Sequence, residues 1–158
     1  MEELPIIAKL KEELSTLQVE LSQELPKRLE EARAHGDLRE NAEYDAAKNR
    51  QGLVRARMGQ IRHRLGELSM YSKATIPRDR ASYGSVVTVE DADSGDETEY
   101  HLVFMEEVER GTPTISMTSP IGQALLNRSV GDEVSVQTPS GKRSMEVVGL
   151  LTLHEREN

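Results

Sequence analysis

Two carboxylates, Asp37 and Glu40, stand three residues apart where one helical pattern ends and the next begins. Glu43 follows at the same spacing, and side chains three residues apart share one face of a helix. Carboxylate oxygens are preferred ligands of Mg²⁺, but two of them hold the ion weakly unless other carboxylates or phosphates complete its coordination. The spacing therefore predicts a half-site for Mg²⁺ that a second molecule completes.

The same residue types also fit a purely structural role. Gly36 suits the left-handed residue that commonly ends a helix, and Asp37 can cap the following helix in a capping box with Glu40. Acidic side chains near a helix N-terminus are further stabilised by the helix dipole. From the spacing alone both interpretations stay open, and a cap would also hold Glu40 in place for metal binding.

Two long helical patterns position this turn. In the first, over residues 4–34, apolar residues recur at steps of three and four, as in the seam of a coiled coil. Pro26 lies inside it, where the apolar spacing shifts, and is expected to kink the helix. A second pattern covers residues 38–68. We therefore expect an antiparallel hairpin with arms roughly 45 Å long, at 1.5 Å per residue.

The expected seam residues alternate with the charged ones along both arms. On the first arm they are Ile7, Leu10, Leu14, Leu17, Leu21, Leu25, Leu29 and Ala32. On the second arm they are Ala47, Gln51, Val54, Met58, Ile61, Leu65 and Leu68. Two basic stripes with seven-residue spacing flank the second seam, namely Lys48, Arg55, Arg62 and Arg50, Arg57, Arg64.

Folding the chain back at the turn predicts ion pairs between the arms. Glu13 is expected near Arg64. Glu20 is expected near Arg57, because Glu20 follows Glu13 by one heptad and Arg57 precedes Arg64 by one heptad. The residue opposite Arg50 would be Lys27, a like charge, so Arg50 and its neighbour Lys48 are the better candidates for binding an external phosphate.

The periodicity changes after a linker at 71–82. Short strand-like segments at 84–89, 97–104, 114–117, 133–138 and 143–150 are separated by turns, and Ser119-Pro120 opens a short helix. Strands in hairpins with one helix are typical of a small antiparallel α+β domain. We therefore expect an α+β protein with a coiled-coil hairpin at 1–76 and a sheet domain at 77–158.

Composition excludes several classes of function. The net charge is −8, and residues 79–158 carry most of it, with 6 basic against 15 acidic side chains. This charge disfavours free binding to duplex nucleic acid. The absence of cysteine excludes disulfides and thiolate metal sites. With no membrane-span or signal pattern and no nucleophile, dinucleotide or phosphate-loop motif, we expect a cytoplasmic protein with no small-molecule substrate and no membrane partner.

The string GDLRENAEY at 36–44, with Ala46-Ala47 and Gln51-Gly52 after it, resembles the tip of the bacterial Gre transcript cleavage factors. SPIGQALL at 119–126 and TPSG at 138–141 resemble the C-terminal domain of that family. The resemblance implies an FKBP-like C-terminal domain that docks on bacterial RNA polymerase at the mouth of its secondary channel. The coiled coil would enter the channel.

The resemblance also implies roles for individual residues. Asp37 and Glu40 would face the backtracked 3′ end of the nascent RNA, share a second Mg²⁺ with the polymerase and position the attacking water. The chain would thus stimulate the cleavage activity of the polymerase without being an enzyme itself. Residues expected to brace the tip or contact the polymerase are Asn41, Glu43 and Tyr44, and those expected to meet RNA are Lys48 and Arg50.

Two other functions remain possible on the sequence. A Gre-like protein that occupies the channel and inhibits without cleavage is disfavoured by the presence of Asp37 and Glu40. A free-standing prolyl isomerase or chaperone would follow from an FKBP-like second half. This function is disfavoured because an isomerase pocket is lined by aromatic side chains, and the whole chain contains one Phe and no Trp.

Overall fold

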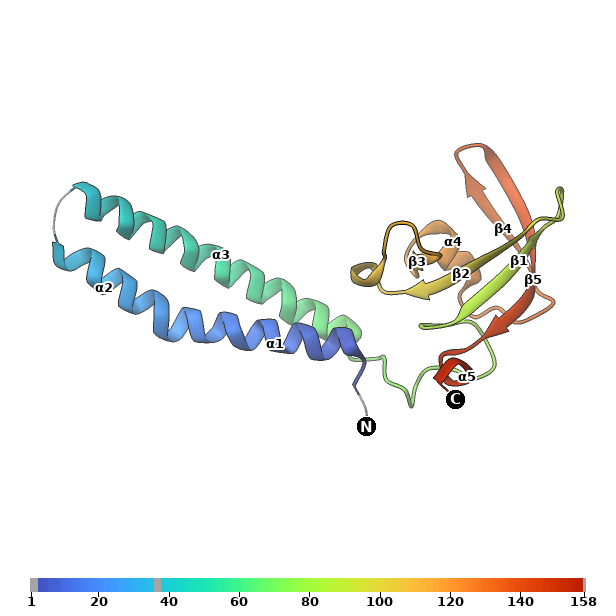
Figure 1. Cartoon of the computed structure of the whole chain (residues 1–158), viewed down its shortest axis with the longest axis horizontal. Coiled ribbons are helices and arrows are strands. Elements are labelled where there is room, and N and C mark those ends of the chain that lie inside the picture. Colours follow the sequence, from blue (N-terminus) through green and yellow to red (C-terminus); the bar gives the residue numbers. More distant parts are fainter. Residues whose placement is uncertain (1–2, 36–37, 158) are drawn as a thin grey trace. The chain divides into compact units, whose positions relative to one another are not determined.

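The computed structural model describes residues 3–35 and 38–157, and of residue 35 and residues 38–41 it describes the backbone alone. The chain forms two compact units, Met1–Ser72 and Lys73–Asn158 (Figure 1). Long helices make up the first, and a sheet with short helices makes up the second, so the expected α+β class is confirmed. In the part of the chain that is described, no helix is both long and apolar enough to cross a membrane.

The first unit is a hairpin of two helical arms that lie side by side (Figure 1). Its first arm comprises α1 (Pro5–Val19), a π-helical turn η1 (Glu20–Glu24) and α2 (Leu25–His35), and its second arm is α3 (Leu38–Leu68). Pro5 at the first helical position suits the start of α1, because no intrahelical bond needs its missing N–H. The predicted caps Gly36 and Asp37 lie outside the described residues.

The break expected at Pro26 takes the form of the π-turn η1. Pro26 has no N–H to donate to the carbonyl of Ser22, four residues earlier. Just before it, the N–H of Leu25 donates to the carbonyl of Glu20, five residues back. A turn of this width takes up one extra residue. The apolar seam therefore continues at Leu25 one position later than a strict heptad would place it.

Apolar side chains from both arms bury each other along the predicted seam. On the first arm the buried residues include Leu10, Leu17, Leu25 and Ala32, and on the second Ala47, Val54, Met58, Ile61 and Leu68. At the start of α1 the buried side chain is Ile6 instead of the predicted Ile7. The remaining predicted seam residues are partly exposed.

Ion pairs between the arms fix the register of the hairpin. Arg57 donates two hydrogen bonds to Glu13, at 2.6 and 2.9 Å. Arg50 donates two to Glu20, at 2.6 and 2.8 Å. The predicted pairs of Glu13 with Arg64 and of Glu20 with Arg57 are therefore wrong by one heptad.

A repeat of seven residues matches itself at every heptad, so the charge pattern alone does not separate neighbouring registers. In the structure both glutamates bind the arginine that lies one heptad nearer the turn than the predicted one. The contacts of the folded hairpin, and not the charge pattern, therefore select the pairing.

The second unit is built on a five-stranded sheet with the strand order β3-β2-β1-β5-β4. Its strands are β1 (Val86–Asp91), β2 (Glu97–Val103), β3 (Thr114–Ser116), β4 (Glu133–Thr138) and β5 (Gly141–Leu151). Neighbours are antiparallel except β3, which lies parallel to β2. The sheet is therefore mixed where the sequence predicted a wholly antiparallel one. The chain between β2 and β3 passes through a 3₁₀ turn, η2 (Met105–Glu107), which replaces a tight hairpin.

The helix predicted after Ser119 is present as α4 (Pro120–Leu125). The Ser119 hydroxyl accepts a hydrogen bond from the N–H of Gly122 at 3.0 Å, and Pro120 occupies the first turn. Gly122 is buried against the backbone of β3: a Cβ at this position would lie 2.0 Å from the Ser116 carbonyl oxygen. Only glycine therefore lets α4 approach the sheet this closely.

A short C-terminal helix, α5 (Leu153–Glu157), was not predicted, because five residues are too few for a helical period to show. Its Arg156 donates to the Gly84 carbonyl and to the His101 ring nitrogen Nε2, both at 2.7 Å. His154 Nε2 lies 2.9 Å from the Ile76 carbonyl oxygen. These bonds fasten α5 to β2 and to the chain that precedes β1.

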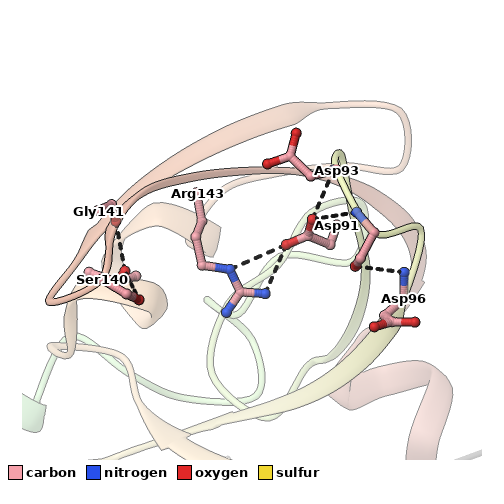
Figure 2. A network of polar contacts seen from close by, with 8 residues as sticks. Asp91, Asp93, Asp96, Ser140, Gly141 and Arg143 are labelled. Atoms are coloured by element: carbon pink, nitrogen blue, oxygen red, sulfur yellow. Dashed lines mark hydrogen bonds and ion pairs between the residues drawn. The ribbon is translucent and has the colours of Figure 1, made fainter.

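An ionic network joins the end of β1 to β5 (Figure 2). The Asp91 carboxylate accepts hydrogen bonds from the backbone N–H groups of Asp93 and Ser94, at 2.9 and 3.0 Å. Arg143 donates to the same carboxylate at 2.9 and 3.2 Å. The Ser94 N–H and the Arg143 guanidinium lower the pKa of Asp91 to about 2.

Replacing Asp91 by Asn is expected to lower the stability of the second unit at pH 7. A carboxyl whose pKa is about 2 when folded, against about 3.9 when unfolded, stabilises the fold above pH 4 and ceases to do so as the pH falls toward 2. The difference between Asp91→Asn and the wild type should therefore shrink over that range. Urea midpoints followed by the NMR amide signals of β1 and β5 measure it.

Asp93→Asn is the control, because it removes the same charge from the same turn without touching Arg143. We expect little change of stability from it. A loss of stability in Asp91→Asn that is as large at pH 2 as at pH 7 would contradict an ionic origin.

Candidate functional site

The end of the hairpin at which α2 meets α3 carries the predicted acidic residues. Asp37 lies outside the described residues, and α3 begins directly after it, at Leu38. Glu40 and Asn41 fall in the first turn of α3, with their side chains outside the described part. Glu43 lies on the same helix with an exposed side chain. Sequence position therefore places Asp37 and Glu40 at the start of a long helix, where a cap and a metal ligand are both compatible with the backbone.

A Mg²⁺ ion requires more ligands than this end of the hairpin offers. Among the described residues no group of three or more His, Asp or Glu side chains is arranged to hold a metal. Asp37 and Glu40 supply hard carboxylate oxygens, which suit Mg²⁺, but only two side chains. The donor set thus fits the ion as half of a shared site.

Tyr44 ties the two arms together close to the turn. Its hydroxyl accepts a hydrogen bond of 3.2 Å from Arg33 of α2, and the Arg33 guanidinium carbon lies 5.4 Å from the centre of the Tyr44 ring. The hydrogen bond from Arg33 lowers the pKa of the Tyr44 hydroxyl. The sequence predicted that Tyr44 braces the tip but did not identify Arg33 as its partner. The signal that could have identified the pair is that both residues lie a similar number of positions from the turn.

A shallow groove of about 290 Å³ lies between the arms beside Tyr44. It is lined by Arg28, Glu31 and Ala32 of α2 and by Glu43 and Ala46 of α3. Glu43 therefore faces a groove of mixed charge next to the turn, where a bound partner would meet its carboxylate.

The two predicted phosphate-binding cations, Lys48 and Arg50, have different surroundings in the structure. Lys48 is exposed, and no hydrogen bond or ion pair is found for it among the described residues. Arg50 instead forms the bidentate pair with Glu20, and its hydrogen bonds lower the pKa of that carboxyl. The prediction that Arg50 faces Lys27 and lacks a partner is wrong, because the register differs by one heptad.

Two further cations share the side of α3 on which Lys48 lies. Arg55 and Arg62 follow it at seven-residue spacing, and both are exposed. In the described chain neither makes a hydrogen bond or an ion pair, because Glu13 and Glu20 of the first arm lie on the opposite side of the seam and bind Arg57 and Arg50.

The second unit carries an apolar pocket of about 450 Å³. It lies between the start of α4 and strands β3 and β4, and its lining residues include Val108, Ile115, Pro120, Ile121, Val136 and Pro139. The two motifs that resembled the Gre C-terminal domain, at 119–126 and 138–141, thus contribute to one pocket. Val108 is 45% exposed, so the pocket opens beside an apolar surface residue.

Comparisons with known proteins cover both units. A model of the N-terminal domain of transcription elongation factors matches residues 6–69, and a model described as "Transcription elongation factor, GreA/GreB, C-term" matches residues 76–151. The chain is 41% identical over 140 residues to transcription elongation factor GreA of Syntrophobacter fumaroxidans, which covers 89% of this chain and 90% of that protein.

A second relative, GreA of Syntrophus aciditrophicus, is 41% identical over 154 residues, which covers 95% of this chain and 96% of that protein. Among solved structures, Gfh1 of Thermus thermophilus is 30% identical to this chain and superposes with a TM-score of 0.42. The matched region covers 92% of this chain and 94% of the Gfh1 chain. The two units thus match the two domains of one class of protein, the transcription elongation factors. The chain belongs to the GreA/GreB family of these factors.

Proposed function

We propose that this chain rescues stalled transcription by inserting its hairpin into the secondary channel of bacterial RNA polymerase and stimulating cleavage of backtracked RNA. The observation that carries the proposal is the hairpin itself. Its acidic turn lies at one end of α3, a helix of 31 residues and therefore about 45 Å long. A small domain needs no helix of that length for its core, so the arm serves to deliver the turn to a distant site.

Within the channel, Asp37 and Glu40 act as ligands that complete the coordination of a Mg²⁺ ion shared with carboxylates of the polymerase. Such an ion, held by Asp37 and Glu40 together with the polymerase, would supply activation of a water nucleophile and stabilisation of negative charge during phosphodiester hydrolysis. Asp37 and Glu40 orient the water and the ion, while the catalytic centre belongs to the polymerase. The chain is thus an accessory factor and has no enzyme activity of its own.

Tyr44 and Arg33 hold the two arms together directly behind the turn. A pair of carboxylates contributes to catalysis only when its position is held within a fraction of an ångström. We assign Tyr44 this positioning role, and Asn41 and Glu43 the contacts of the tip with the polymerase. Lys48 is exposed and makes no hydrogen bond or ion pair with the residues that the structure describes, so it remains the stronger candidate for meeting the RNA.

Purified polymerase stalled in a backtracked complex with labelled RNA tests the proposal. Adding this protein in the presence of Mg²⁺ should release short 3′ fragments and return the complex to elongation. Omitting Mg²⁺ should prevent the release. Binding without release, combined with slower elongation, would favour the alternative of a channel-occupying inhibitor.

The apolar pocket of the second unit is the surface best formed for docking on the rim of the channel. Ile121→Asp places a charge in the lining without altering the Ser119 cap, and we expect the affinity for polymerase to fall at least about tenfold. Titration of labelled protein with core polymerase measures the loss. Val130→Asp is the matched control, since Val130 is an exposed apolar residue of the same unit outside the pocket lining. Equal losses in both variants would contradict docking through the pocket.

A further inference from the structure

One face of α3 alternates cations with glycines over its length. Lys48, Arg55 and Arg62 are interleaved with three glycines at steps of four and three residues, which places all six on one side of the helix. The glycines are Gly52, Gly59 and Gly66. We call these six residues the basic glycine face.

The cations of this face are not used by the hairpin. Glu13 of α1 and Glu20 of η1 bind the other basic stripe of α3. The first arm offers only Lys11 and Gln18 at the heptad positions that flank the seam on the side of the basic glycine face. Within the described residues the three cations are exposed and form no hydrogen bond or ion pair.

The glycines are not required by the hairpin either. No described atom lies within 4 Å of the position that a Cβ would occupy at Gly52, Gly59 or Gly66. Glycine inside a helix is unfavourable relative to alanine, because it loses more backbone entropy on folding. Three such residues in one line, with open space above each, leave the helix backbone accessible to a body that packs against it from outside.

We propose that the basic glycine face from Gly52 to Gly66 is the docking surface for an acidic α-helix of RNA polymerase, which packs along α3 as a third helix of the hairpin, while Lys48 at the turn end of the face keeps its role toward the RNA. This inference rests on the proposed function, because it takes the polymerase as the partner. Small residues let two helix backbones approach closely, and cations at heptad spacing pair with carboxylates at the same spacing on a neighbouring helix.

The glycines favour a helix over a nucleic acid as the occupant, because an open helix backbone lets a second helix approach closely. Successive cations of the face are separated by seven residues, or about 10.5 Å of helix rise, and a partner helix with acidic residues every seven positions matches that interval. The net charge of −8 also disfavours a general affinity for polyanions.

The first test measures binding of the full-length protein to core RNA polymerase that contains no nucleic acid. The double variant Arg55→Glu, Arg62→Glu should bind at least tenfold more weakly, and its affinity should depend less on salt. The control Lys9→Glu, Lys27→Glu makes the same charge change on exposed residues of the first arm and should bind like the wild type.

The second test separates packing from charge. Gly59→Gln should raise the melting temperature of the hairpin, since glutamine is a better helix former than glycine. It should nevertheless weaken binding to polymerase several-fold, because the side chain occupies the space left for the partner. Ala56→Gln adds a similar side chain at an exposed position off the basic glycine face and should leave binding unchanged. If Gly59 has only a structural role, Gly59→Gln should raise the melting temperature without weakening binding to polymerase.

The outcomes distinguish the inference from the function on which it rests. If the wild type does not bind polymerase, the proposed function fails and the inference fails with it. If the wild type binds and stimulates cleavage while the Arg55→Glu, Arg62→Glu and Gly59→Gln variants bind equally well, the inference alone is wrong. If the variants bind more weakly only when the polymerase carries a backtracked transcript, RNA is the occupant of the face and the proposal of an acidic helix is wrong. A photo-crosslinking residue in place of Gly52, on the basic glycine face, should attach to an acidic helical segment of the polymerase.

Discussion

Replacing Asp37 or Glu40 by alanine is expected to reduce the release of 3′ RNA fragments by at least about 100-fold, with polymerase binding retained. Each substitution removes one of the two carboxylates that the chain contributes to the shared Mg²⁺ site, and loss of a metal ligand weakens both the ion and the water that it orients. Single-turnover cleavage by saturating protein measures the chemical step separately from binding.

Asparagine at position 37 separates the two roles that the sequence leaves open. Asn caps a helix about as well as Asp, so Asp37→Asn keeps the cap and loses the charge, whereas Asp37→Ala loses both. We expect the alanine variant alone to lose about 1 kcal/mol of hairpin stability and both variants to lose cleavage. If Asp37→Asn stimulates cleavage at the wild-type rate, Asp37 acts only as a helix cap and the metal-binding role is wrong.

Replacing Gly122 by alanine is expected to destabilise the second unit by about 3 kcal/mol or more. The added Cβ would lie 2.0 Å from the carbonyl oxygen of Ser116 and 2.9 Å from the Cα of Met117. Both atoms belong to the backbone and do not move aside as a flexible side chain does, so α4 has to shift away from β3. Because α4 lines the apolar pocket, the shift should also weaken docking on polymerase.

Thermal unfolding of the second unit, followed by the NMR signals of its sheet, measures this effect. Gly52→Ala is the matched control, since a Cβ there has no neighbour within 4 Å, and it should stabilise α3 by up to about 1 kcal/mol. Similar behaviour of the two variants would contradict the close approach of α4 to β3.

Local patterns sufficed for much of the fold. Most of the seam residues, the bounds of α3 and the Ser119 cap follow from side-chain periodicity and from hydrogen bonds within a few residues, so they were predicted correctly. The helix α5 was missed because it is too short for its pattern to show. The parallel β3 was missed because strand direction depends on the path of the whole connection after β2.

For the candidate site, the sequence by itself determined which residues stand at the turn and which cations line α3. Only the tertiary structure decided which of those cations are paired. The same charge pattern fits neighbouring heptad pairings, and only the contacts of the folded hairpin show that Glu20 binds Arg50 and Glu13 binds Arg57. Both glutamates lie on one side of the seam, so the cations of the basic glycine face, on the other side, stay exposed and make no hydrogen bond or ion pair with the residues that the structure describes.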